Sequence, residues 1–282
     1  MLNTDITIVI NTFNSDEQIF LCLDSINPKY KILIIENSNN SKFKENIEKK
    51  YLNVKCYLTG ENLGYAKGNN FGLSKVKSKF ALILNPDTLL KENSIDNFFN
   101  SVKKYPNFAI IAPAIQEQKD IENNKYIGMK DLIEVDSVKG FGMFLNISQF
   151  NEIGFFDDNF FIYFEEIDLC KRLRNKNKYI YLDPSILIDH IGGSSHNASI
   201  NFEMELSRNW HWMWSTFYFH KKYNGFIIAL LKISRKLCSA LIKVLIYTLM
   251  FNQKKKKIYY HRLSGLFNSI IGNKSWYRPK IF

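Results

Sequence analysis

Apolar runs of strand length alternate with stretches of helical length through the first third of the chain. The apolar runs cover residues 6–10, 32–35, 54–58 and 80–84, with helices expected from Ser15, around 42–50 and over 65–77. Strands that alternate with helices are joined by crossover connections, which place the strands parallel in one sheet and the helices on its faces. The sequence therefore predicts an α/β fold whose sheet is mostly parallel and flanked by helices.

The character of the chain changes near residue 200. Trp210, Trp212 and Trp214 lie close together and precede an apolar helical stretch over 225–251. Residues 221–282 hold 14 Lys or Arg and no Asp or Glu, whereas residues 1–220 carry 24 basic and 27 acidic residues. With 282 residues the chain has room for a large domain and an appendage. We expect an α/β domain over 1–200 and a helical, basic region over 201–282.

The basic region indicates an anionic partner, because its charge is local rather than spread over the chain. Basic residues interrupt the stretch 226–251, so it lacks the run of about 18 apolar residues that a spanning helix needs. The run Lys254–Lys257 and the rings of Trp276 and Tyr277 favour an amphipathic helix at a membrane surface. A solvated basic helix covering the first domain is the alternative, and nucleic acid is not expected as a partner.

The four cysteines and the N-terminus favour a cytoplasmic setting. Cys22, Cys56, Cys170 and Cys238 show neither CxxC nor paired spacing. Polar residues at positions 3–5 interrupt any signal-peptide pattern. We expect a reducing compartment, with the basic region at the inner face of the membrane.

Polar residues follow the first two apolar runs. No GxGxxG motif occurs at 11–15, which excludes the dinucleotide fingerprint there. Asn14 or Ser15 could cap the next helix, with Gln18 completing a capping box, as readily as contact a ligand. Glu36 ends the second run and places a carboxylate at the same edge of the sheet, where it could accept the imide N–H of a uracil or thymine.

The string Asn62-Leu63-Gly64-Tyr65-Ala66-Lys67-Gly68-Asn69-Asn70 gathers glycines, amides and a lysine before the fourth strand. Glycines admit a close approach of backbone to a ligand, and Lys67 could contact a phosphate. Asparagine and glycine also form ordinary turns, so the string alone predicts a ligand site no better than a turn.

The buried run 80–84 ends in Asn85-Pro86-Asp87. Ligand sites of open α/β sheets lie outside the carboxyl ends of the strands, and a hard divalent cation on a diphosphate takes oxygen ligands. Asp87 with Asn85 would suit a weakly held Mg²⁺ or Mn²⁺. The alternative is an ordinary turn in which Asp87 caps the next helix.

Two further segments carry groups able to do chemistry. Glu165, Glu166 and Asp168 follow a run of aromatic residues at an expected helix start, where Asp168 can pair with Arg172 four positions on. Acids in a first turn also suit the helix dipole, so one or two of the three could be structural. His190 ends an apolar run before Gly192-Gly193-Ser194 and could complete a metal shell, although a lone histidine is more often structural.

Taken in order, these segments resemble the family 2 glycosyltransferases of GT-A fold, in particular the rhamnosyltransferase-like branch that builds bacterial surface polysaccharides. The resemblance covers about residues 5–196. The motifs that carry it are 62–70, Leu84-Asn85-Pro86-Asp87-Thr88, Gly154-Phe155-Phe156-Asp157 through Phe164-Glu165-Glu166-Ile167-Asp168-Leu169, and His190-Ile191-Gly192-Gly193-Ser194. Two positions depart from the family pattern: Asn85 begins the DxD-type motif, and Glu165-Glu166 stands where Glu-Asp is usual.

The resemblance implies a role for each candidate residue. Asn85 and Asp87 would occupy the metal motif, His190 would lie at the metal and diphosphate, and Glu166 would be the general base, with Glu165 and Asp168 as its neighbours. The residues implied to hold the nucleotide sugar are Thr12, Asn14, Glu36, Asn62, Gly64, Lys67, Asn70 and Asn85. Residues 1–200 would then be the catalytic domain.

The implied reaction is a direct, inverting displacement that needs Mn²⁺ or Mg²⁺. The base would take the proton of an acceptor hydroxyl as its oxygen attacks the anomeric carbon. The branch favours dTDP-rhamnose as donor, with UDP-hexoses next, and a glycan or lipid-linked acceptor. Two alternatives stay open: a nucleotidyltransferase, which lacks its glycine-rich basic first loop here, and a non-catalytic sugar-nucleotide binder or scaffold in a polysaccharide assembly complex.

Overall fold

The computed structural model describes residues 3–16, 18–115, 129, 131–190 and 198–280. The chain divides into two compact units. The sheet unit comprises Met1–Phe156 and Glu166–Asn197, and the helical unit comprises Asp157–Glu165 and Ala198–Phe282. The segment 157–165, which lies in the middle of the sequence motifs, therefore belongs with the C-terminal helices.

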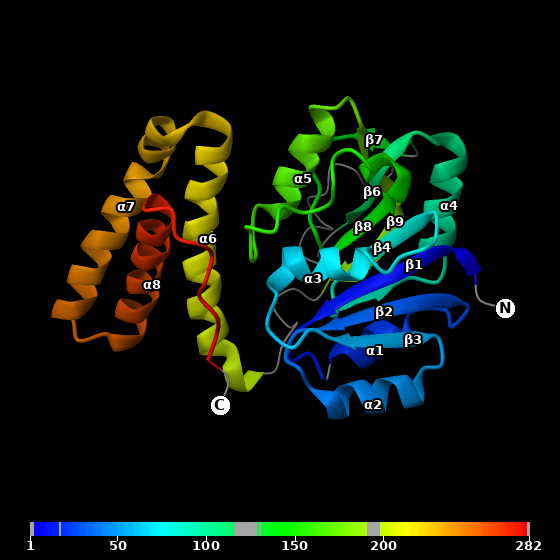
Figure 1. Ribbon diagram of the computed structural model, residues 1–282, viewed down its shortest axis with the longest axis horizontal. Helices are drawn as coiled ribbons and strands as arrows, with labels where there is room; N and C mark the ends of the chain where they lie inside the picture. The colour runs from blue at the N-terminus through cyan, green and yellow to red at the C-terminus, as the bar shows by residue number, and fades with distance from the viewer. Residues whose placement is uncertain (1–2, 17, 116–128, 130, 191–197, 281–282) are drawn as a thin grey trace. The chain divides into compact units, whose positions relative to one another are not determined.

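The sheet unit is built on a nine-stranded sheet with the order β3-β2-β1-β4-β8-β6-β9-β5, in which β7 also pairs with β9 (Figure 1). The strands are β1 (Asn3–Thr12), β2 (Tyr30–Glu36), β3 (Val54–Leu58), β4 (Phe80–Leu84), β5 (Thr88–Leu90), β6 (Phe108–Ile115), β7 (Ile133–Glu134), β8 (Gly142–Asn146) and β9 (Tyr179–His190). Strands β3, β2, β1 and β4 are mutually parallel, as are β6 and β9, while β8, β5 and β7 pair antiparallel. The predicted α/β class with a flanked, mostly parallel sheet is confirmed.

The described residues of the sheet unit form five α-helices. They are α1 (Gln18–Asp24), α2 (Ser41–Lys50), α3 (Gly64–Leu73), α4 (Ser94–Lys104) and α5 (Glu165–Arg174). The last of them, α5, begins at Glu165, a residue of the helical unit. The α2 boundaries follow from local chemistry, because Asn40 Oδ1 accepts the Phe43 N–H at 3.0 Å and lysines occupy the last turn. Helix α3 ends earlier than expected: Lys75 N and Val76 N donate to Gly72 and Leu73 carbonyls and turn the chain.

Aromatic rings fill the core beside the central strands. The Phe144 ring stacks on Phe98 at 4.8 Å, on Phe80 at 5.2 Å and on Phe108 at 5.6 Å between ring centroids. Phe98, Phe108 and Phe144 are fully buried. Each such side chain stabilises the fold by roughly 1.5–3 kcal/mol through its removal from water. Strand β4, with all five residues buried, is held between β1 and β8 in this core.

Glycines let α3 lie directly on the sheet. A Cβ at Gly72 would stand 2.5 Å from Val9 Cγ1 and 3.0 Å from Ile35 Cγ1, both on buried strand residues. A Cβ at Gly68 would stand 2.5 Å from the Asn11 amide nitrogen. The helix backbone therefore approaches the ends of β1 and β2 more closely than any side chain would allow.

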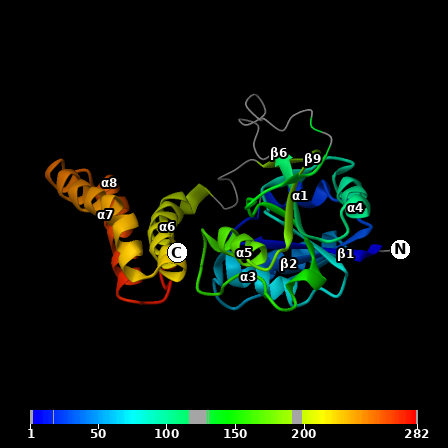
Figure 2. The ribbon, with the colours of Figure 1, turned by 90° about the horizontal axis from the view of Figure 1, so that it is seen from above.

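Three long helices make up most of the described part of the helical unit and pack side by side in both views (Figures 1 and 2). They are α6 (Asn201–Asn224), α7 (Phe226–Leu249) and α8 (Gln253–Ile270). Their shared core contains Met213, Phe217, Ala229, Ile233 and Leu266. Across the described residues, no helix combines the length and the apolar character needed to cross a bilayer.

Gly72→Ala should destabilise the protein although alanine is the better helix former. The added methyl group meets Val9 and Ile35, and overpacking of this kind costs about 1–3 kcal/mol, more than the ~1 kcal/mol gained in helix propensity. Urea unfolding should show a lower free energy of unfolding, whereas Lys67→Ala on the exposed side of α3 should change it by less than about 0.5 kcal/mol. A stabilised Gly72→Ala protein would contradict this packing.

Candidate active site

Two side-chain amides, a partly buried one on Asn11 and a buried one on Asn37, join the elements at the carboxyl edge of the parallel strands. Asn11, at the end of β1, donates from Nδ2 to the Gly64 carbonyl at 2.9 Å, and its Oδ1 accepts a short hydrogen bond from Asn37 Nδ2. Asn37 follows β2; its Oδ1 accepts the Leu63 N–H at 3.0 Å, and its Nδ2 donates to the Thr12 carbonyl at 3.1 Å. This amide pair fixes β1, β2 and the start of α3 relative to one another. Neither residue is among the site residues predicted from the sequence.

The predicted nucleoside residues lie along the same edge. Thr12 is buried and donates to the Ile35 carbonyl at 3.3 Å. Asn14 adopts a positive φ of 49°, and its buried amide nitrogen donates to none of the described residues. Buried amide groups are nearly always hydrogen-bonded, so this donor is an available contact for a ligand.

Glu36 is engaged within its own turn. One carboxylate oxygen accepts the Ser38 N–H at 3.0 Å and a short bond from the Ser38 hydroxyl, and the other accepts the Asn40 N–H at 2.8 Å. The residue is 2% exposed. These bonds orient the carboxylate and hold the turn after β2. A base contact by Glu36 stays a prediction, and it would have to use the lone pairs that the turn leaves.

The string 62–70 forms a turn followed by helix α3, as the turn interpretation expects, and the site interpretation stays a prediction. Asn62 Oδ1 accepts the Gly64 N–H at 3.0 Å, and Gly64 has a φ of 74°. Lys67 is exposed on α3, and its phosphate contact stays a prediction. Asn70, in contrast, uses its amide on the Phe156 backbone, donating to O at 2.8 Å and accepting from N at 3.0 Å. Its sugar-nucleotide contact stays a prediction.

Asn85-Pro86-Asp87-Thr88 is a turn that leads into a strand. The Asn85 carbonyl accepts the Thr88 N–H at 3.3 Å and the Thr88 hydroxyl at 2.7 Å, and the Asn85 N–H donates to Phe141. The predicted turn is therefore present. The prediction that Asp87 caps the next helix was wrong, because β5 follows at Thr88 and α4 begins only at Ser94. Asn85 is partly exposed at the edge of the sheet.

The pairing of β5 with β9 brings Asp87 and His190 together. Thr88 lies opposite His190 in this antiparallel pair, so the preceding Asp87 comes beside the imidazole. His190 Nε2 is 3.4 Å from Asp87 Oδ1, and the imidazole stacks on the Phe141 ring at 4.8 Å and 11°. The glycine and serine that follow His190, at 192–194, fall outside the described residues.

These two side chains fit a cation that is held partly by its substrate. Asp87 is 3% exposed, and its Oδ1 accepts no hydrogen bond from the described part of the chain. Carboxylate oxygen and neutral imidazole are both ligands of Mn²⁺, and Mg²⁺ accepts carboxylate, phosphate and water oxygens. Across the described residues, no group of three or more His, Cys, Asp or Glu side chains could hold a metal by itself. A metal held by this pair would keep coordination positions for the oxygens of a bound diphosphate.

The start of α5 follows a strained aromatic loop. Tyr163 and Phe164 have φ values of 72° and 70°, a region that costs bulky side chains free energy, of order 1–3 kcal/mol each. The helical unit supports them: Trp212 of α6 contacts both rings, at 5.3 Å and 5.4 Å, and Ser215 donates to the Ile162 carbonyl at 3.0 Å. Strain of this kind persists only where packing enforces it, and it is typical of functional loops.

The beginning of the same segment is anchored on α6 as well. Asp157 Oδ2 accepts Lys222 Nζ at 2.8 Å and the Tyr218 hydroxyl at 3.0 Å. Burial alone would raise the pKa of Asp157, but the hydrogen bonds from Lys222 and Asn159, with the Lys222 charge, outweigh it and hold the pKa below its usual value. The segment that leads into the acidic motif is thus fastened at both ends to one helix.

The three acids of α5 differ in their surroundings. Asp168 is fully buried and pairs with Arg172 at 2.8 Å, as predicted, while Arg172 also donates to the Ile153 carbonyl at 2.8 Å. Asp168 therefore has a structural partner. Burial raises the pKa of Glu166, against weaker lowering by the Glu166 and Ile167 backbone N–H groups. Glu165, the first residue of α5, is buried.

The structure thus places the predicted residues in two groups. Around the sheet edge it brings together the β1 and β2 turns, the start of α3, and the pair Asp87–His190. On α5 it separates a carboxylate with a raised pKa, Glu166, from one held in an ion pair, Asp168. The signal that could have revealed Asn11 and Asn37 was their placement at the carboxyl ends of two neighbouring strands.

Comparison with known proteins supplies the context for this geometry. Residues 7–170 match the model of glycosyl transferase family 2. The low-salt glycan biosynthesis hexosyltransferase Agl10 of Haloferax volcanii is 27% identical over 195 residues, 61% of this chain, and the match spans 62% of that relative. The rhamnosyltransferase WbbL of Escherichia coli K12 is 25% identical over 240 residues, 72% of this chain and 88% of WbbL.

Solved structures share the fold at low sequence identity. The mannosyltransferase PcManGT from Pyrobaculum calidifontis, in complex with GDP-Man and Mn²⁺, has a TM-score of 0.59 and 12% identity over 94% of this chain and 87% of its own. TarS of S. aureus gives a TM-score of 0.56 and 12% identity over 94% of this chain and 55% of its own.

Glu166→Gln should stabilise the folded protein in a pH-dependent way. Because burial raises the pKa of Glu166 in the folded state, that state binds the proton more tightly than the unfolded chain does, and stability falls as the pH rises from about 4.5 through the raised value. Glutamine removes this loss. Thermal unfolding should show a higher Tm for the variant at pH 8 and no difference near pH 4. The exposed control Glu152→Gln should show no such trend, and identical Tm–pH curves for wild type and Glu166→Gln would contradict the assignment.

Proposed function

The chain belongs to glycosyl transferase family 2, and from that membership we propose that it is an inverting, divalent-metal-dependent glycosyltransferase of cell-surface glycan synthesis. The observation that carries the proposal is the buried Asp87 carboxylate, with Oδ1 unsatisfied among the described residues and His190 Nε2 at 3.4 Å, at the carboxyl edge of the sheet. A buried carboxylate in that state is costly unless a ligand satisfies it.

The donor we propose is dTDP-rhamnose, with UDP-hexoses as the next choice, and the acceptor is a glycan or a lipid-linked glycan. The similarity to a rhamnosyltransferase supports the first choice, and the similarity to a hexosyltransferase leaves room for the second. Thr12, Asn14 and Glu36 would contact the nucleoside, and Lys67 the diphosphate. Backbone turns on either side of the Asn11–Asn37 pair would set the shape of the nucleoside site.

In the proposed reaction Glu166 takes the proton from the acceptor hydroxyl while that oxygen attacks the anomeric carbon and the nucleoside diphosphate departs. A general base works best when its pKa lies near the working pH, and burial moves the pKa of Glu166 in that direction. Asp87 and His190 would hold Mn²⁺ or Mg²⁺, which supplies positive charge to the leaving diphosphate. Asp168, committed to Arg172, would position α5 rather than react.

A non-catalytic sugar-nucleotide binder in a polysaccharide assembly complex is the second candidate. It is favoured by two positions where this chain departs from the usual pattern, Asn85 in the metal motif and Glu166 at the base. Such a protein would bind the donor without turning it over. Turnover therefore separates the two candidates where binding cannot.

Transfer can be tested with purified protein, a panel of dTDP- and UDP-sugars, a glycan or lipid-linked glycan as acceptor, and Mn²⁺. One donor should raise the Tm only when Mn²⁺ is present, because binding to the folded state stabilises it. Asp87→Asn should abolish this metal-dependent shift. Glu166→Gln should keep it while lowering turnover, followed as release of the nucleoside diphosphate, by about 10²- to 10⁴-fold. A donor-dependent shift in a wild-type protein without any turnover would favour the binding protein.

We also propose that the protein is cytoplasmic and peripheral at the inner face of the membrane. Large apolar side chains of α7 and the residues after it stand in solvent: Ile227, Leu231, Leu245, Leu249 and Phe251 are 65–84% exposed. Lys254–Lys257 follow directly. An exposed apolar helix face next to a run of cations is typical of helices that lie in the interface of an anionic membrane.

Leu245→Gln/Leu249→Gln should weaken membrane binding without unfolding the protein, because both side chains are exposed. About 2 kcal/mol of apolar burial is lost with two such residues, which predicts binding weaker by a factor of roughly 30. Sedimentation with vesicles containing 30 mol% phosphatidylglycerol measures it. Ser234→Gln/Thr248→Gln, on exposed polar positions of the same helix, is the matched control. Equal binding by both variants and the wild type would contradict the proposed membrane face.

A further inference from the structure

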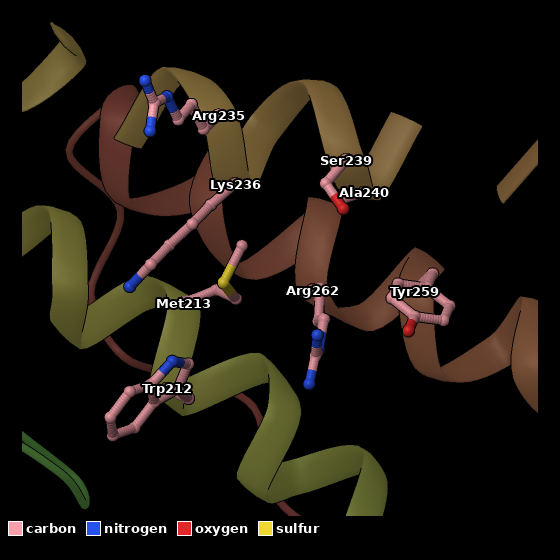
Figure 3. Close-up of a pocket in the computed structure, with 8 residues that line it drawn as sticks. All are labelled: Trp212, Met213, Arg235, Lys236, Ser239, Ala240, Tyr259 and Arg262. Carbon is pink, nitrogen blue, oxygen red and sulfur yellow. The ribbon is translucent and has the colours of Figure 1, made fainter. Parts of the chain in front are cut away.

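A cavity of about 230 Å³ opens between the three helices of the helical unit (Figure 3). Its lining combines cations, aromatic rings and a hydroxyl: Trp212 and Met213 from α6, Arg235, Lys236, Ser239 and Ala240 from α7, and Tyr259 and Arg262 from α8. The volume is below the range of about 300–1,000 Å³ that drug-sized ligands need. A compact group such as a phosphate fits this space, whereas a whole nucleotide sugar does not.

The cavity is cationic and contains no acid. Lys236 extends from α7 toward Trp212, with Nζ 5.5 Å from the ring centroid (Figure 3). Arg235 lies at the rim of the cavity and points away from Trp212 (Figure 3). Arg262 lies over Tyr259 at 5.1 Å and donates to Asn209 Oδ1 at 2.6 Å. Partial burial, then the charge of Arg262, lowers the pKa of Lys236. No carboxylate lines the cavity, and residues 206–282 include no Asp or Glu. The acids of the three helices, Glu203 and Glu205, both lie near the start of α6.

Apolar side chains flank the cationic rim. Leu231 and Ile242, one and two turns from Arg235 along α7, are 69% and 56% exposed. Residues four and seven positions apart share a helix face, so these side chains stand beside Arg235. An anion bound in the cavity would therefore have an apolar surface next to it, a pairing that suits a phosphate carried on an alkyl chain.

We propose that this cavity binds the phosphate group of a membrane-embedded lipid. Arginine and lysine are the usual phosphate ligands, and the Ser239 hydroxyl adds a donor. The site deepens the proposed membrane association and rests on it: the α7 face supplies apolar contact, and the cavity supplies recognition of a headgroup. Trp212, which forms one wall, also contacts Tyr163 and Phe164, so an occupied cavity borders the loop that precedes α5.

The test uses dihexanoyl phosphatidic acid, kept below its critical micelle concentration, and calorimetric titration of the full-length protein in 0.15 M salt. Without a bilayer, and with a Debye length of about 8 Å, distant surface charges contribute little. Arg235→Gln/Lys236→Gln should weaken binding by about tenfold or more while leaving the Arg262–Asn209 hydrogen bond intact. Lys254→Gln/Lys257→Gln removes the same charge from the exposed run outside the cavity and should change binding by less than about twofold.

Two results would overturn the proposal. Equal weakening by the two variants would mean that diffuse charge, not the cavity, attracts the lipid. Inorganic phosphate binding as tightly as the lipid would make a free anion the occupant. Neither result touches the proposed transferase, since the donor-dependent Tm shift should be the same in the wild type and both variants. If Leu245→Gln/Leu249→Gln weakens vesicle binding and Arg235→Gln/Lys236→Gln does not, the membrane face is supported and the headgroup site is contradicted.

Discussion

The paired amides of Asn11 and Asn37 are the constraint on which the rest of the sheet-edge site depends. Parallel strands end where their ladder hydrogen bonds run out, and the chain segments beyond them have no intrinsic reason to stay together. Here the two side chains form hydrogen bonds with each other and with the backbone of Thr12, Leu63 and Gly64. Buried amides are costly when unpaired, so the arrangement is specific as well as stable. The glycines of α3 are required by the same arrangement, because Gly68 leaves the space that Asn11 occupies.

A second constraint is strand register. Asp87 and His190 are about a hundred positions apart, and neither has any local reason to meet the other. The antiparallel pairing of β5 with β9 sets Thr88 against His190, and a slip of one residue would turn the imidazole to the other face of the sheet. The main contribution of the short strand β5 is therefore to position these two site residues. It places the turn after β4 beside His190, as one half of the proposed cation-binding pair.

Much of this could be predicted where one local pattern dominates. Residues 54–58 and 80–84 are strands with the expected boundaries, because each apolar run is bounded by polar residues. Strand β9 continues through the polar residue Asp183, which no apolar run would predict. Asp183 accepts the Ser185 N–H at 2.8 Å and a short bond from the Ser101 hydroxyl, so its carboxylate is hydrogen-bonded inside the strand. The Asn70–Phe156 contacts and the positive φ values of Tyr163 and Phe164 depend on tertiary packing, which no local pattern encodes.

The segment 157–165 has a consequence for anyone who recombines proteins of this family. It lies between two parts of the sheet unit in sequence, yet its contacts through Asp157, Ile162, Tyr163 and Phe164 are with α6. A chimera cut at residue 200 would join the helices of one parent to the loop of another and leave Trp212 and Lys222 facing foreign side chains. A graft should instead exchange residues 157–165 together with residues 198–282, because both segments belong to one compact unit.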